Sequence, residues 1–253
     1  METNRIRHGD CKEIMGTFPA NCIDLTVTSP PYDNLRKYKG FDFDFEGIAN
    51  QLFRITKPGG VVVWVVGDAT VKGSETGTSF KQALYFKEIG FNLHDTMIWN
   101  KTNAMPQVDK SRYTQCFEYM FVLSKGKPNV TNMLKVPTKN GGKYLPRGDG
   151  NSDNINKAGG NVVANERIDF NIYKLAVGNK NNGHPAVFPE KLANDQIISW
   201  SNKGDLVLDP FCGSGTTCKM AVENDRNYIG IEISEEYVNI SKQRCSITKS
   251  LIS

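Results

Sequence analysis

The chain has 253 residues and a net charge of +4, and its 39% hydrophobic and 23% charged residues are the balance of an ordinary globular protein. No apolar run approaches the ~18 residues that a membrane helix needs, and the polar N-terminus "METNRIRHGD" has no apolar signal-peptide core. These features argue against a membrane protein and favour a cytoplasmic one. The six cysteines form no C-x-x-C pair and the three histidines are scattered, so we expect reduced thiols and no metal site.

Apolar runs alternate with helical patterns along most of the chain. Strands are expected at residues 4–8, 23–28, 59–68, 95–101, 117–125, 205–209 and 227–232, and helices at 46–57, 79–89, 189–202, 216–224 and 234–246. The run "GGVVVWVVGD" (59–68) is continuously apolar, as in a strand buried on both faces. This order predicts an α/β fold: a doubly wound, mostly parallel seven-stranded sheet with helices on both faces.

One long segment interrupts the alternation. Residues 126–183 are dense in Asn, Gly and Lys and carry no long amphipathic pattern. They could be a disordered linker or an inserted recognition module with short strands. Inside a compact domain, a connection of this length is too long to serve only as a linker between two elements.

A glycine loop near the C-terminus has the pattern of a nucleotide-binding unit. In "DLVLDPFCGSGTTCKMAVENDRNYIGIEIS" (205–234), a strand ends at Asp209, Gly213 and Gly215 follow, and the next strand ends at Glu232. Glycines let the backbone approach a ligand, the helix N-terminus favours negative charge, and the spaced acid can bind a ribose. The loop lacks the P-loop pattern and a third glycine, so an adenosine ligand is favoured over a triphosphate or a dinucleotide. The alternative is a glycine-rich turn without a ligand.

A second unusual stretch is "TVTSPPYDNLRKY" (26–38), in which a buried strand ends in Ser29-Pro30-Pro31-Tyr32. Prolines cannot continue a sheet ladder or enter a helix interior. Taken alone, the stretch could be a proline-rich strand end and turn.

Together "DPFCGSGTT" (209–217) and "TSPPY" (28–32) resemble the S-adenosylmethionine-dependent DNA amino-methyltransferases, in the order of parts of their β group. "GD" (9–10), "FEYMFVLSKGKP" (117–128) and "HPAVFPEKL" (184–192) are similar to further elements of that family. The resemblance implies a permuted methyltransferase fold. Its expected parts are a catalytic half (1–125), an inserted target-recognition region (126–183) and a cofactor-binding half (184–253).

The resemblance also implies a role for each motif residue. The residues expected to bind S-adenosylmethionine are Asp10 at the adenine, Phe188 at the methionine part, Asp209, Phe211, Gly213, Gly215, Thr216, Thr217, and Glu232 at the ribose. Simpler interpretations exist for three of them. Phe211 could be core, Asp10 could be only a helix N-cap, and Phe188 could be a hydrophobic staple.

The catalytic residues that the resemblance implies are Ser29, Pro30, Pro31 and Tyr32. The Ser29 hydroxyl and the Pro30 carbonyl can accept both N–H bonds of a base amino group, and Tyr32 can stack on an extruded base. In the family, Ser at this place goes mainly with cytosine N4, and Asp or Asn with adenine N6. We therefore favour a DNA cytosine-N4 methyltransferase over an adenine-N6 enzyme. A protein amide methyltransferase and a non-catalytic nucleic-acid-binding protein are more remote alternatives.

Double-stranded DNA is the expected partner. The candidate phosphate contacts are Arg36, Lys37, Lys101, Lys110, Arg112, Lys135, Lys139, Lys143 and Arg147, although such residues can equally form a solvated face. A cognate restriction endonuclease and a homodimer are further partners that the resemblance raises. The sequence specifies neither of them, nor the recognition site.

Overall fold

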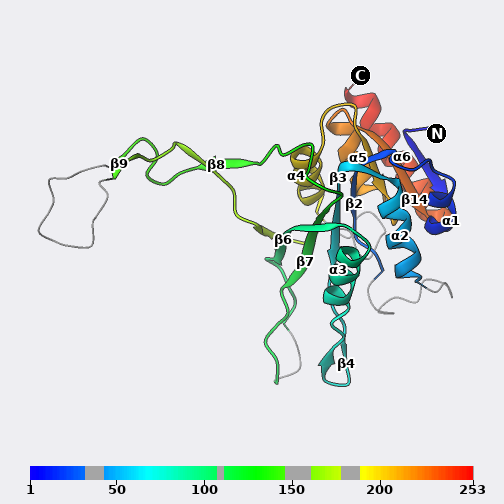
Figure 1. The fold of residues 1–253 in the computed structure, drawn as a ribbon, viewed down its shortest axis with the longest axis horizontal. Helices are drawn as coiled ribbons and strands as arrows, with labels where there is room; N and C mark the ends of the chain where they lie inside the picture. Colours follow the sequence, from blue (N-terminus) through cyan, green and yellow to red (C-terminus); the bar gives the residue numbers. More distant parts are fainter. Residues whose placement is uncertain (32–42, 107–110, 146–160, 178–188, 253) are drawn as a thin grey trace, which may run out of the picture. The chain divides into compact units, whose positions relative to one another are not determined.

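An eight-stranded sheet organises the computed structural model, which describes residues 1–31, 43–106, 111–145, 161–177 and 189–252 (Figure 1). In spatial order its strands are β1 (Arg5–His8), β14 (Asn227–Glu232), β13 (Leu206–Asp209), β2 (Ile23–Thr28), β3 (Thr56–Val66), β7 (Phe117–Ser124), β6 (Asn92–Lys101) and β12 (Ile172–Leu175). All neighbouring strands pair in parallel except where β7 meets β3 and β6. The carboxyl ends of all but β7 therefore meet at one edge of the sheet.

Helices cover both faces of this sheet. On one face lie α1 (Cys11–Gly16), α2 (Phe45–Ile55) and α3 (Thr78–Glu88), and on the other lie α4 (Glu190–Trp200), α5 (Thr216–Glu223) and α6 (Glu235–Ile252). The first face takes alternate β3 side chains, Val62, Trp64 and Val66, into its core. The intervening valines of β3 are also buried, which explains the continuous apolar run of that strand.

The predicted doubly wound, mostly parallel fold is confirmed, but the predicted number of strands is wrong. The eighth strand is β12, which pairs in parallel with β6 from Ile172↔Ile98 to Leu175↔Lys101. Its four residues lie in the Asn-rich segment, and a strand this short at a sheet edge leaves only a weak alternating pattern. Helix α1 is indicated in the sequence only by the possible N-cap at Asp10, because its six residues show less than two turns of periodicity.

The chain divides into two compact units: residues Met1–Asn132 with Asn171–Ser253, and residues Met133–Phe170. The described residues of the smaller unit form two antiparallel ladders. One pairs β8 (Lys135–Pro137) with β11 (Glu166–Ile168), and the other pairs β9 (Tyr144–Leu145) with β10 (Asn161–Val162).

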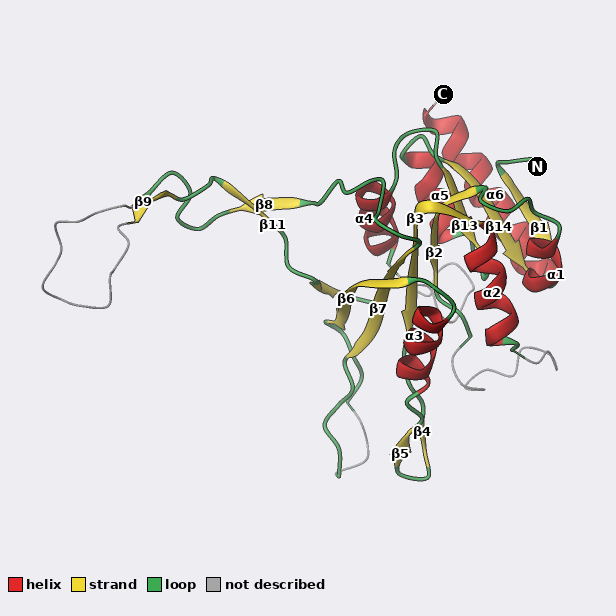
Figure 2. Cartoon of the chain, viewed as in Figure 1, coloured by secondary structure: helices red, strands yellow, loops and turns green. Residues whose placement is uncertain are grey.

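The larger unit carries two projections beyond the carboxyl edge of its sheet. They are a hairpin of β4 (Thr70–Val71) and β5 (Ser74–Glu75), which follows β3, and the connection between β6 and β7 (Figure 2). The Arg112 guanidinium of the second projection donates to the Gly73 carbonyl of the first, so the two are joined. No helix in the described part of the chain is long and apolar enough to cross a membrane.

Candidate active site

Four adjacent strands bring the two sequence motifs to one edge of the sheet. In the order β1, β14, β13 and β2, these strands end beside Asp10, Glu232, Asp209 and Ser29. Ligands of open α/β sheets bind outside the carboxyl ends of the strands. Segments at opposite ends of the chain therefore contribute to one candidate site.

The glycine loop is shaped by backbone conformations that favour glycine. Gly213 has φ 51° and Gly215 has φ 84°, and Gly215 is the N-cap of α5. A Cβ on Gly215 would lie 2.7 Å from the Cβ of Ser241 in α6. The loop thus passes directly over α6 and leads into a helix N-terminus, where partial positive charge can hold an anion.

Glu232 connects the end of β14 to this loop. Its Oε2 accepts from the Gly213 amide at 2.8 Å, and its Oε1 accepts from the Ser234 amide at 2.8 Å. The side chain is buried, yet a carboxylate offers about four acceptor sites, so it can still accept from hydroxyl groups of a ligand. Glu232 therefore both fixes the loop and remains suited to a ribose.

Asp10 lies next to Glu232, because His8 is the register partner of Glu232 and Asp10 follows two residues later. Its Oδ1 accepts from the Glu13 amide at 3.0 Å and caps α1. The simpler interpretation from the sequence, a helix N-cap, is thus observed. The cap occupies one carboxylate oxygen.

Asp209 joins the cofactor strand to the catalytic strand. Its Oδ1 accepts from the Thr28 hydroxyl at 2.7 Å, across 181 positions of sequence, and from the Phe211 amide at 3.1 Å. Burial raises the pKa of Asp209 to about 6, while the hydrogen bonds to the carboxylate act in the opposite direction. Because Thr28 directly precedes Ser29, this hydrogen bond fixes the start of the Ser-Pro-Pro stretch relative to the glycine loop.

The remaining loop residues lie partly in the core. The Phe211 ring contacts Trp64 and Phe43 edge-on, with centroids 6.1 and 5.7 Å apart, so it packs against the hydrophobic core. Thr216 and Thr217 are both buried, and the Thr217 hydroxyl donates to the Val27 carbonyl of β2 at 3.1 Å. This bond holds α5 against the catalytic strand.

The catalytic stretch begins where β2 ends. Pro30 is buried, and Ser29 and Pro31 are half-buried. Neither proline has an N–H to continue the ladder, so the strand stops here. Two residues expected in the site, Tyr32 and Phe188, lie outside the described residues.

Sequence reasoning missed several polar residues at the same edge. Asp68 follows β3 and accepts from both the amide and the hydroxyl of Ser79, at 2.9 and 2.5 Å. Its "GD" pattern repeats that of residues 9–10 and could have indicated it. No comparable sequence pattern indicates that Thr28 lies at the site. Lys101, a candidate phosphate contact, forms an ion pair with Glu118 of β7.

Comparison with known proteins identifies the family. The sequence profile of the DNA methylase family of N6- and N4-methyltransferases matches residues 23–243. The chain belongs to this family. It is 55% identical over 236 residues to the orphan methyltransferase M.BamHII of Bacillus amyloliquefaciens, covering 88% of each chain.

Two solved structures are similar to this DNA methylase. M1.HpyAVI in complex with SAM matches with a TM-score of 0.64 at 25% identity, over 95% of this chain and 98% of the other. The cytosine-N4-specific PvuII DNA methyltransferase matches with a TM-score of 0.69 over 98% of this chain and 91% of the other, and at 22% identity this likeness shows the fold alone. The family resemblance read from the sequence is confirmed.

The methyl donor of this family is S-adenosylmethionine, and the groups at the carboxyl edge fit that molecule. Carboxylates at two strand ends suit its hydroxyl and amino groups, and the N-terminus of α5 suits its carboxylate. No group of three or more His, Cys, Asp or Glu side chains within the described ranges could hold a metal ion.

Proposed function

We propose that this DNA methylase is site-specific and transfers the methyl group of S-adenosylmethionine to the exocyclic N4 of a flipped cytosine. The observation that carries the proposal is the buried Thr28–Asp209 hydrogen bond. It ties the Ser-Pro-Pro stretch to the strand that begins the glycine loop, so a base held by the first would lie beside a cofactor held by the second. Ser29 then favours cytosine over adenine.

We assign the cofactor contacts from the same geometry. Glu232 accepts from the ribose hydroxyls, Asp10 contacts the adenine, and the N-terminus of α5 holds the methionine carboxylate. Phe211, which is half-buried, is proposed to border the cofactor. We keep Phe188 as a proposed contact from the sequence alone.

The base amino group is a poor nucleophile, because its lone pair is delocalised into the ring. The Ser29 hydroxyl oxygen and the Pro30 carbonyl oxygen would each accept a hydrogen bond from one N–H group of the base amino group. These two hydrogen bonds would turn the nitrogen lone pair out of the ring plane. The bound cofactor supplies a methyl group on a positively charged sulfur, so the work left to the protein is alignment. Tyr32 is the proposed stacking face for the extruded base.

The alternative is an adenine-N6 enzyme, since the family profile covers both products. Unmethylated plasmid DNA should be incubated with the protein and S-adenosylmethionine, digested to nucleosides and analysed by mass spectrometry. We expect N4-methyldeoxycytidine. N6-methyldeoxyadenosine as the sole product would replace cytosine with adenine, and no modified nucleoside on varied DNA would contradict both.

DNA recognition is proposed to lie in residues 126–183. In the smaller unit, Lys135, Lys139 and Lys143 are exposed, and so are large apolar side chains at Tyr144, Val162, Ile168 and Phe170. Lysines would hold phosphates, and the other exposed side chains would contact base edges. A partner endonuclease and a homodimer stay predictions.

A further inference from the structure

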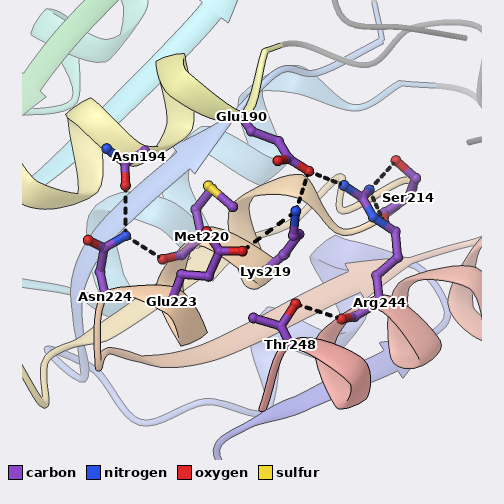
Figure 3. Close-up of polar contacts among 9 residues, drawn as sticks. All are labelled: Glu190, Asn194, Ser214, Lys219, Met220, Glu223, Asn224, Arg244 and Thr248. Carbon is purple, nitrogen blue, oxygen red and sulfur yellow. Dashed lines mark hydrogen bonds and ion pairs between the residues drawn. The ribbon is translucent and has the colours of Figure 1, made fainter. Parts of the chain in front are cut away.

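Helix α6 holds the glycine loop by a route that lies outside the sequence motifs. The Arg244 Nη1 donates to the Ser214 carbonyl at 2.6 Å and to the Ser214 hydroxyl at 2.9 Å (Figure 3). Ser241, three residues earlier on α6, packs against Gly215. One face of α6 thus contacts two consecutive residues of the loop.

The guanidinium of Arg244 is itself fixed. Its Nη2 donates to Glu190 Oε1 at 2.8 Å, and the same oxygen accepts from the Lys219 ammonium at 2.7 Å. Burial would raise the pKa of Glu190, but the hydrogen bond from Lys219 and the charges of Lys219 and Arg244 lower it overall. Glu190 therefore stays ionised at neutral pH and orients Arg244 toward the loop.

The glycine loop is conformationally free unless other residues hold it. Ser214 stands between two glycines at positive φ, and glycine restricts the backbone least of all residues. Ser214 itself is buried, so its carbonyl must find a partner inside the protein. Arg244 supplies that partner and a second bond to the side chain. A planar guanidinium can make both bonds and still donate to Glu190, which an ammonium can do only with a different geometry.

We propose that Arg244 is a positioning residue for the cofactor loop, holding Ser214 so that the Gly213 and Gly215 backbone and the start of α5 are preorganised for S-adenosylmethionine. This inference rests on the proposed function only in assigning the loop to that cofactor. Preorganisation raises affinity by removing the cost of ordering the loop on binding. Lys219 provides a matched control, because its side chain forms ion pairs with the same Glu190 and with Glu223 but makes no hydrogen bond to the loop.

The test compares R244M, R244K, S214A and K219M by calorimetric titration with S-adenosylmethionine in the absence of DNA. We expect the dissociation constant to rise about ten-fold in R244M, with R244K between R244M and the wild type, since ten-fold corresponds to about 1.4 kcal/mol. S214A should raise the dissociation constant about three-fold. In the R244M background it should cause no further rise, because both changes remove the hydrogen bond between Arg244 and the Ser214 hydroxyl. K219M should stay within about two-fold of the wild type, since Arg244 keeps its own hydrogen bonds to Glu190 and Ser214 and the Lys219 side chain makes none to the loop.

Kinetics add a readout that a general loss of stability would not produce. R244M should raise the KM for S-adenosylmethionine, while kcat at saturating cofactor and the KM for DNA stay within about two-fold. Urea denaturation verifies that each variant is folded. If R244M is not folded, the comparison uses R244K in its place. Wild-type affinity in R244M and R244K, or an equal loss in K219M, would overturn the inference. Weakened cofactor binding in a protein that methylates no DNA would leave it standing and reject the proposed function.

Discussion

At the scale of single residues, the chemistry depends most on Ser29. Its position is set by the preceding Thr28, whose hydroxyl is held by Asp209, and by Pro30, whose ring lies in the interior. A side chain at the end of a strand fixed in this way can be placed accurately enough to align a base amino group.

Replacing Ser29 by Ala should therefore affect the chemical step far more than cofactor binding. We expect Ser29→Ala to lower kcat by more than ten-fold, a change of about 1.4 kcal/mol in the barrier. Single-turnover methylation measures the rate, and calorimetric titration with S-adenosylmethionine measures binding. Undiminished turnover in a folded variant would remove Ser29 from the mechanism.

At the scale of elements, the contact between β2 and β13 links the two halves of the site. Asp209 is buried and has a pKa of about 6, above its ordinary 3.8. Its contribution to folding stability is therefore fully present below about pH 4 and is lost as the pH rises through 6, where a buried charge must form. The Thr28 hydroxyl stabilises that charge.

Thr28→Val should raise the pKa of Asp209 further and should cost stability in a pH-dependent way. We expect a loss of about 1–3 kcal/mol at pH 8, where the carboxylate is ionised, and a smaller loss at pH 5. Urea denaturation at the two pH values measures it. In an Asp209→Asn background the Thr28→Val cost should be the same at both pH values; a pH-independent cost in the wild-type background would contradict the assignment.

The same elements show what sequence can and cannot predict. The runs that form β2, β3 and β13 and the glycine loop are local patterns, and each was found close to its observed place. The Thr28–Asp209 bond and the Arg244–Ser214 contacts join residues far apart in sequence whose types are unremarkable by themselves. They become visible only when the strand order is known. Short elements such as α1 and β12 are hard to predict for a different reason, since they are too short to show a periodic pattern of apolar residues.

At the scale of the whole molecule, DNA binding is expected to depend on basic side chains that contact phosphates. Two of the candidate phosphate contacts in the larger unit have partners: Lys101 pairs with Glu118, and Arg112 bonds Gly73. Lys139 and Lys143 of the smaller unit are exposed and remain available to phosphates. Arg36, Lys37, Lys110 and Arg147 lie outside the described residues.

Replacing Lys139 and Lys143 together by Gln should weaken DNA binding without changing cofactor affinity. Each phosphate contact contributes about 0.9 to the slope of log affinity against log salt, so the slope should fall by about 1–2. Fluorescence anisotropy with duplex DNA over a range of salt measures it. The matched control replaces Lys87 and Lys203, exposed lysines of the larger unit that lie near the end of α3 and before β13, away from the carboxyl edge. Equal slopes in the two double variants would contradict a DNA-binding role for the smaller unit.

The identity of the methylated nucleoside tests the central claim most directly. Unmethylated DNA should be treated in parallel with the wild type and with Ser29→Ala, using a deuterated methyl donor, and the digested nucleosides quantified by mass spectrometry. The wild type should give deuterated N4-methyldeoxycytidine, and the variant at least ten-fold less at equal times. Deuterated N6-methyldeoxyadenosine in place of the cytosine product would contradict the claim.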